Sequence, residues 1–129
     1  MRILSLFLLL FLSSLLYGQN IDCEKFKDGK FKILDEEYGT YYLERKGSKQ
    51  IEYSEGTRRK VEMKVKWIND CIYTLELVKV LENPDSIFFD TDMILTIKII
   101  EVKDNSYIQQ TTAENVDFMM ESEVIKVED

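Results

Sequence analysis

The feature that most constrains this chain is a strict alternation of apolar and polar side chains. Between residues 61 and 67, Val61, Met63, Val65 and Trp67 take alternate positions, and charged residues take the others. Successive side chains of a strand point to opposite faces, so the pattern predicts an antiparallel strand with one buried and one solvated face. A clean apolar repeat at helical spacing is not found along the chain, which favours an all-β fold.

The alternation recurs between short turn segments. After Leu77 it loses its parity, which indicates either a β-bulge or a strand that is covered on both faces. Asn69 and Asp70 both tolerate positive φ, so they favour a tight hairpin turn. A helix over 113–121, where the alternation is weakest, stays open as an alternative. The predicted strands are 29–34, 40–45, 50–53, 61–67, a strand that begins at Cys71, 93–99, 107–113 and 124–127.

Seven or eight short strands joined by turns prefer to pair with their neighbours in sequence. The expected architecture is therefore an antiparallel up-and-down meander. A meander of this size closes into a barrel or forms a two-layer sandwich. Both forms stay open from the sequence.

The N-terminal segment has the pattern of a secretory signal peptide. Arg2 supplies a positive charge, residues 3–12 are almost wholly apolar, and the small Gly18 precedes the polar Gln19. The apolar run is shorter than a membrane span. We therefore predict that residues 1–18 are a signal peptide and residues 19–129 a single domain. The protein is then periplasmic, on the cell surface or secreted, without stable membrane insertion. A retained anchor or a buried helix is the alternative.

Export changes the expectation for the two cysteines. An even pair in an oxidising compartment favours a disulfide between Cys23 and Cys71. The bond would close a loop of 71 − 23 = 48 residues. A loop of that length stabilises a fold by about 4 kcal/mol in the chain-entropy description. Two separate buried thiols are the alternative.

Composition excludes several functions. The chain has no histidine, which rules out a Ser-His-Asp triad and a His-ligated zinc. Its net charge of −7 disfavours nucleic acid as a partner, because phosphate contacts need a positive surface. No spacing of carboxylates identifies a hydrolytic pair. We therefore expect a protein that is not an enzyme, with no catalytic residues, no cofactor and no metal site.

Two segments are candidates for binding. Trp67 and Tyr73 either line a ligand cavity or are core residues beside the disulfide. Ile87, Phe88 and Phe89 form an apolar triplet within the longest loop. That triplet is either a partner-binding tip or a cover folded over an open barrel end. The aspartates around it lack the spacing of a calcium-binding loop.

Two basic clusters stand out on an acidic chain. Arg45 and Lys46 with Lys49 form the first, and residues 58–60 form the second. Each either contacts an acidic or phosphorylated partner or is a solvated strand end that discourages edge pairing.

Three stretches in this order carry a resemblance: residues 23–31, residues 43–52, and the Trp-x-x-Asp-Cys-x-Tyr-x-Leu element at 67–75. Together they resemble a group of small exported proteins of Bacteroidota that has no settled function. The resemblance implies a lipocalin-like β fold and brings no catalytic residues. Some members of that group carry a DNA topoisomerase label. That label is not carried over, because this chain is acidic, has an export pattern and lacks a nucleotide-binding loop.

The functional hypothesis is an exported, non-catalytic binding protein, expected to be a monomer. Its ligand would be a small apolar molecule or a protein partner, bound through a barrel mouth or through the loop with Ile87 and Phe89. The alternative is a structural or interaction subunit of a cell-envelope or secretion assembly without a ligand pocket.

Overall fold

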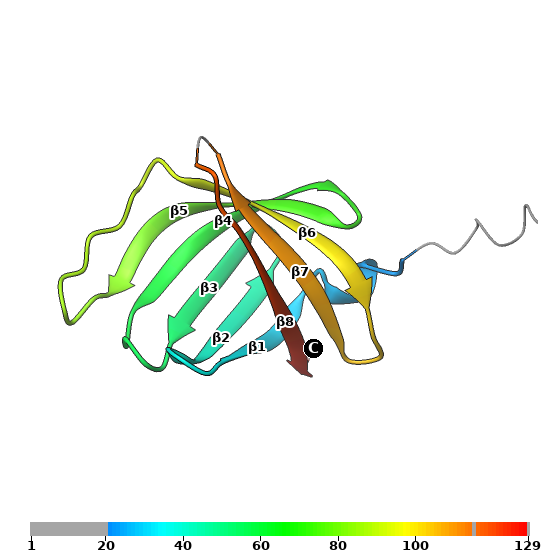
Figure 1. Ribbon diagram of the computed structural model, residues 1–129, viewed down its shortest axis with the longest axis horizontal. Helices are drawn as coiled ribbons and strands as arrows, with labels where there is room; N and C mark the ends of the chain where they lie inside the picture. Colours follow the sequence, from blue (N-terminus) through cyan, green and yellow to red (C-terminus); the bar gives the residue numbers. More distant parts are fainter. Residues whose placement is uncertain (1–20, 115, 129) are drawn as a thin grey trace, which may run out of the picture.

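Eight antiparallel strands form a closed barrel in which each strand pairs with its neighbours in sequence and β1 pairs with β8 (Figure 1). The computed structural model describes residues 21–114 and 116–128, and the predicted signal peptide lies outside them. A short 3-10 helix, η2, precedes the strands. The elements are η2 (Glu24–Phe26), β1 (Gly29–Asp35), β2 (Gly39–Lys46), β3 (Lys49–Ser54), β4 (Lys60–Asn69), β5 (Ile72–Glu82), β6 (Ile94–Val102), β7 (Ser106–Ala113) and β8 (Met119–Glu128).

The predicted meander is confirmed, and the pairing of the first with the last strand decides for a barrel. That pairing is short: it joins Lys30 to Glu128, Phe31 to Lys126 and Lys32 to Ile125, with a bulge within it. Closure removes both edge strands, which would otherwise expose unpaired backbone groups. The architecture is a lipocalin-like barrel.

The last strand is longer than its alternation predicts. Met119 and Met120 pair with Thr112 and Thr111 in the ladder between β7 and β8. The alternative of a helix over 113–121 is therefore wrong for the described residues of that segment. The hairpin ladder overrides a locally weak strand pattern, because each added pair satisfies backbone groups of both strands.

The loss of parity after Leu77 is a β-bulge. Met63 pairs with Leu77 while Glu62 pairs with Lys79, so Val78 is the extra residue on β5. Val78 is 58% exposed, so the strand is not covered on both faces here. Bulges bend a strand and increase its twist, which helps an open sheet to curl into a barrel.

The turn between β4 and β5 forms in a different way from the one expected. Neither Asn69 nor Asp70 has positive φ. Instead, the backbone N–H of Cys71 donates a 2.9 Å hydrogen bond to Oδ1 of Asn69. An Asn side chain that bonds the backbone two residues on reproduces a turn without left-handed geometry.

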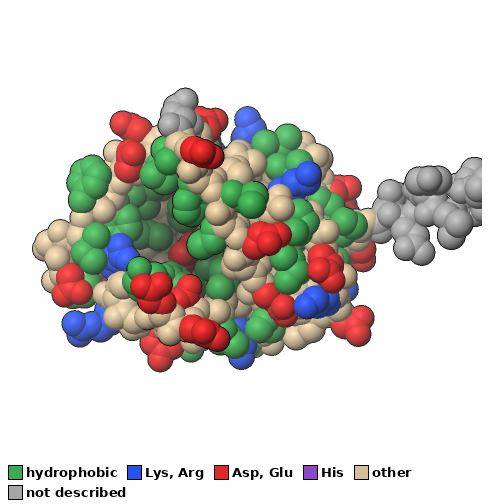
Figure 2. All heavy atoms as spheres, viewed as in Figure 1, with side chains coloured by type: hydrophobic (Ala, Val, Ile, Leu, Met, Phe, Trp, Pro, Cys, Tyr) green, Lys and Arg blue, Asp and Glu red, His purple; other side chains and the backbone are tan. Residues whose placement is uncertain are grey.

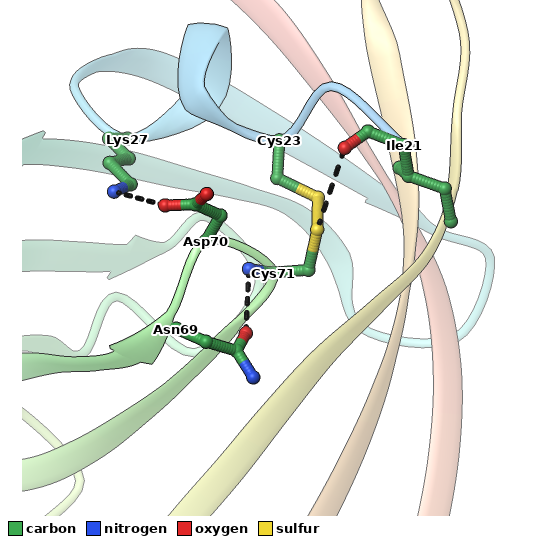
Figure 3. Close-up of a disulfide and its surroundings, with 6 residues drawn as sticks. All are labelled: Ile21, Cys23, Lys27, Asn69, Asp70 and Cys71. Atoms are coloured by element: carbon green, nitrogen blue, oxygen red, sulfur yellow. Dashed lines mark hydrogen bonds and ion pairs between the residues drawn. A yellow bond between two sulfur atoms is a disulfide. The ribbon is translucent and has the colours of Figure 1, made fainter. Parts of the chain in front are cut away.

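The predicted disulfide is present and fastens one end of the barrel. Cys23 precedes η2 and Cys71 lies in the β4–β5 turn, and their Cα atoms are 5.3 Å apart. Figure 3 shows the bond, together with an ion pair of 3.3 Å between Lys27 and Asp70 beside it. These links hold η2 across the barrel end, where Phe26 is buried. We call this end the closed end.

The core is concentrated in the closed end. The largest buried side chains there include Phe26, Phe31, Tyr73, Tyr107 and Arg45. The opposite end, which we call the open end, carries the β1–β2, β3–β4 and β7–β8 turns and the loop at 83–93 (Figure 1). Among the described residues, no helix is long and apolar enough to cross a membrane.

Candidate ligand cavity

A cavity of about 620 Å³ occupies the open half of the barrel. Figure 2 shows it as a hollow lined by hydrophobic side chains, with acidic side chains within and around it. Its apolar walls come from both sides of the barrel. They comprise Ile33, Leu34, Leu43, Leu75, Leu95, Ile97, Met120 and Ile125, with the rings of Tyr38, Tyr41 and Tyr73.

The hollow follows from the sizes of the inward side chains. Eight-stranded barrels have an interior that side chains just fill, or that holds one small ligand. In the closed end the inward positions carry aromatic rings and Arg45. In the open half β7 and β8 contribute the smaller Thr111 and Ser122. These leave volume that the neighbouring strands do not fill.

A hydrogen-bonded cluster around Arg45 forms the floor. Arg45 is 1% exposed and lies at the centre of the closed end. Its guanidinium donates to Oε1 of Gln50 at 3.0 Å and to the carbonyl of Phe26 at 2.8 Å. It also donates to the hydroxyls of Tyr73 and Tyr107, each at 3.0 Å. A buried cation is tolerated when its donors are satisfied in this way.

Aromatic rings surround the same guanidinium. Its central carbon lies 4.6 Å from the ring centroid of Tyr73, 4.9 Å from that of Phe31 and 5.9 Å from that of Trp67. Cation–π attraction adds to the hydrogen bonds. The interpretation of Arg45 as part of a solvated basic cluster is therefore wrong. Its parity with Tyr41 and Leu43, which share its strand, was the signal for an inward side chain.

Glu52 stands in the cavity wall one inward step above Gln50. It pairs with Leu43 on β2 and with Val61 on β4, and both of these side chains are buried. Burial raises the pKa of Glu52, while a hydrogen bond from Gln50 and the charge of Arg45 lower it in part. The net direction is upward, so the surroundings disfavour the ionised carboxylate.

Tyr41 also lines the cavity and is affected by the carboxylates of the lining. Burial raises the pKa of its hydroxyl, and the charges of Asp35 and Glu52 act in the same direction. A hydrogen bond with Ser54 and the charge of Arg59 oppose the rise. On the floor, burial and then the neighbouring Tyr107 raise the pKa of Tyr73 well above its usual value. Both tyrosines are therefore neutral hydroxyls near pH 7.

The mouth follows from incomplete pairing at the open end. β1 pairs with β8 only from Lys30 to Lys32, although β1 continues to Asp35. The part of β1 that does not pair with β8 lines the cavity, and so does the facing part of β8. The cavity therefore reaches the surface between these two segments. On the other side, β5 pairs with β6 only as far as Glu76 and Ile94.

The turns at the mouth pack against one another. A Cβ atom added to Gly56, in the β3–β4 turn, would lie 1.9 Å from the carbonyl oxygen of Tyr38 in the β1–β2 turn. Only glycine permits this approach of two backbones. It fixes the two turns side by side and shapes the rim next to Tyr38.

The two aromatic candidates occupy different places. Tyr73 lines the cavity floor, where its hydroxyl lies 3.3 Å from Oε1 of Gln109. Trp67 is not among the lining residues and packs on Tyr73 in the closed end, with ring centroids 4.5 Å apart. The structure thus places Tyr73 on the cavity and Trp67 in the core below it, beside the disulfide. A binding role for either stays a prediction.

The three apolar residues of the loop, Ile87, Phe88 and Phe89, differ in their exposure and contacts. Phe88 is 87% exposed at the open end. Phe89 is half-buried, and the guanidinium of Arg59 lies 5.4 Å from its ring centroid. Ile87 is exposed, and its backbone is held by two hydrogen bonds with the side chain of Asn83, at 2.8 and 3.1 Å. The triplet does not line the cavity.

The second basic cluster lies beside this loop at the open end. Arg59 donates to the hydroxyl of Thr57 at 3.0 Å in addition to its contact with Phe89. Arg58 is exposed and has a φ of 57°. Within the described residues, no three or more side chains of the metal-binding types gather in one place.

Sequence reasoning missed Glu52 because the alternation on β3 is reversed relative to its neighbours. The apolar residues Ile51 and Tyr53 share a face, but that face points outward and lines a second groove of about 420 Å³ on the outside of the barrel. The polar set of Gln50, Glu52 and Ser54 points inward. The register with β2 would have revealed this, since Arg45 pairs with Gln50 and Leu43 with Glu52.

No protein-family model, no curated protein and no solved structure matches the chain. The resemblance to exported Bacteroidota proteins therefore stays a prediction.

Proposed function

We propose that the protein is an exported, non-catalytic binding protein that holds one small, largely apolar ligand in the barrel. The single observation that carries the proposal is the cavity of about 620 Å³ in the open half. Small-molecule sites in proteins have volumes of roughly 300–1,000 Å³ and combine apolar walls with a few placed polar groups. This cavity has both features.

The arrangement suits retention of a ligand better than catalysis. The polar groups on the floor are engaged with one another: Gln50 with Arg45, and Tyr73 with Arg45 and Gln109. Such a floor is rigid and presents fixed hydrogen-bonding groups to a ligand. A rigid site pays less conformational entropy when it binds.

The disulfide supports the export part of the proposal. Disulfides persist in oxidising compartments and are rare in the cytosol. Mass spectrometry of the protein recovered outside the cytoplasm is expected to show a chain that begins near Gln19. Recovery of a chain that still begins with Met1 contradicts this part. Sedimentation of the same material tests the expected monomer.

The binding test uses a neutral fluorescent probe, N-phenyl-1-naphthylamine, which brightens in apolar surroundings. Titration is expected to give saturable binding to one site. The variant Leu95→Trp fills the cavity and is expected to weaken binding by about tenfold or more, a loss of about 1.4 kcal/mol. Leu95 is a suitable position because it lines the cavity from β6, which takes no part in the β1–β8 opening.

The matched control is Lys98→Trp, on the same strand. Lys98 is exposed on the outside of β6, so the same ring is added without entering the cavity. Probe affinity in this variant is expected to equal that of the parent. Equal binding by the parent and Leu95→Trp, or no binding by the parent, overturns the proposal.

A second candidate function rests on Phe88. Phe88 is 87% exposed in the loop at 83–93, so its ring is available for burial against a protein partner. This observation favours an interaction subunit of an envelope assembly. Phe88→Asp and Phe89→Asp are then expected to lose a partner captured from the envelope fraction while the fold survives. An unchanged partner list contradicts this candidate.

A further inference from the structure

The charges of the cavity share one sign. Four charged side chains line it, and all four are carboxylates: Asp35, Glu52, Glu121 and Glu123. No Lys or Arg is among the lining residues. Glu123 is neutralised from outside by Lys103, whose Nζ lies 3.1 Å from its Oε2. The others give the cavity a negative potential that selects for cations.

Glu52 is the carboxylate placed deepest. The ladder puts it next to Gln50, which is 1% exposed, whereas Asp35 and Glu121 stand at the mouth on β1 and β8. An ionised carboxylate away from water is costly unless a cation or several hydrogen-bond donors meet it. Among the described residues, Glu52 has no ion pair.

Arg45 does not act as a direct counterion of Glu52. Its guanidinium donors point to Gln50, Phe26, Tyr73 and Tyr107. The side chain of Gln50 stands between the two charges: its oxygen accepts from Arg45, and its amide lowers the pKa of Glu52 only in part. The Glu52 carboxylate therefore keeps acceptor capacity on the side that faces the cavity.

We propose that the ligand of this cavity is an organic cation, an ammonium group carried on an apolar body, and that Glu52 accepts its charge. This inference rests on the proposed ligand-binding function. The ammonium donates to Glu52, and the hydroxyl of Thr111 and the amide of Gln109 lie on the same lining. The apolar body contacts Leu75, Leu95 and the other aliphatic walls.

The walls distinguish an organic cation from a hydrated metal ion. A hard metal ion requires six or more oxygen ligands. An ammonium requires only a few acceptors, and its carbon chain gains about 0.8 kcal/mol for each methylene group buried. Within the described residues, the carboxylates of the lining do not gather as a set of metal ligands, whereas the walls offer many aliphatic contacts. An amphipathic amine can therefore use both its charge and its carbon chain.

The test compares three ligands with the same ten-carbon chain and different head groups: decylammonium, decanol and decanoate. Affinities are measured by calorimetry below the concentration at which each ligand forms micelles or separates from solution. Decylammonium is expected to bind at least about tenfold more tightly than decanol, and decanoate most weakly. In Glu52→Gln the preference for decylammonium over decanol is expected to fall within about twofold, while decanol keeps its affinity.

The matched control is Glu121→Gln, which removes an exposed carboxylate at the mouth. Solvent screens that charge, so most of the preference for the cation is expected to remain. Circular dichroism of each variant checks the fold.

The outcomes separate the two proposals. If decanol, decanoate and decylammonium bind equally well, or decanoate binds best, the organic cation is overturned and the ligand-binding function stands. If Glu121→Gln abolishes the preference and Glu52→Gln does not, the assignment to Glu52 is overturned. If neither these ligands nor the neutral probe binds, the binding function itself fails.

Discussion

Nε of Arg45 donates a 3.0 Å hydrogen bond to the side-chain oxygen of Gln50 in the interior of the barrel. This bond joins the sealed half of the molecule to the hollow half. Below it, aromatic rings and η2 surround the guanidinium. Above it, Glu52 stands in the cavity wall. Gln50 also lines the cavity, so the contact marks the cavity floor.

Replacing Arg45 is expected to unfold the closed end. Arg45→Met leaves the hydroxyls of Tyr73 and Tyr107 and the carbonyl of Phe26 without their donor. An unsatisfied buried polar group costs about 1–3 kcal/mol, so we expect a loss of about 3 kcal/mol in urea denaturation. Lys46→Met, at the exposed neighbour, is the control and is expected to change stability by less than about 0.5 kcal/mol. Similar values for both variants contradict the role of Arg45.

Removing the disulfide is expected to cost about 4 kcal/mol, because the bond closes a loop between residues separated by 48 positions. The double variant Cys23→Ser with Cys71→Ser is compared with the parent in urea without reductant. Reductant added to the parent is expected to reproduce most of the loss. Detection of two free thiols in denatured, unreduced parent protein would contradict the bond.

Glu52→Gln is expected to stabilise the protein near pH 7. Burial raises the folded pKa of Glu52 above its ordinary value of 4.5. Below pH 4.5 the carboxyl is protonated in both the folded and the unfolded state, so a raised folded pKa does not lower the stability of the protein there. The loss of stability caused by Glu52 grows as the pH rises through the folded pKa, and it is constant at higher pH. The urea midpoints of the variant and the parent are therefore expected to converge as pH falls to about 4.

Neither the tyrosines near Glu52 nor Arg45 changes its charge over this range. Tyr41 and Tyr73 are neutral because burial raises the pKa of each, and Arg45 stays protonated. Glu44→Gln, on the outside of β2, is the matched control and is expected to show no such pH dependence. A Glu52→Gln variant that is less stable than the parent at pH 7 would mean that Glu52 serves chiefly as the counterion of Arg45.

The two phenylalanines of the loop are expected to contribute differently to the stability of the protein. Phe89 lies under the guanidinium of Arg59, so Phe89→Ala is expected to cost about 1 kcal/mol in urea denaturation. Phe88 is exposed, so Phe88→Ala is expected to stay within about 0.5 kcal/mol of the parent. An equal loss of stability in the two variants would contradict a structural role for the contact between Phe89 and Arg59.

Much of the barrel was predictable from local patterns. On β4, alternation from Val61 to Trp67 placed the right residues inside, because each strand separates two chemically different faces. The disulfide was predictable from the even number of cysteines together with the predicted export. The start of β8 at Met119 was not, because its pairing with β7 rather than its own sequence extends that strand.

The candidate site was predictable only in part. The sequence pattern points to Tyr73, which lines the cavity, but not to Glu52. Alternation on β3 defines two faces without saying which one points inward, and its apolar face, with Ile51 and Tyr53, points outward. A charged side chain is usually solvated, so the sequence predicts Arg45 at the surface, whereas the structure buries it.

The sequence by itself determined eight alternating segments, the turns between them and a pair of cysteines, because these depend on neighbours close along the chain. The tertiary structure decided three further properties: the closure of β1 on β8, the unfilled volume above Arg45 and the inward direction of Glu52. Each depends on the sizes and charges of side chains from strands distant in sequence. A packed floor and an open half arise only when those strands meet around one axis.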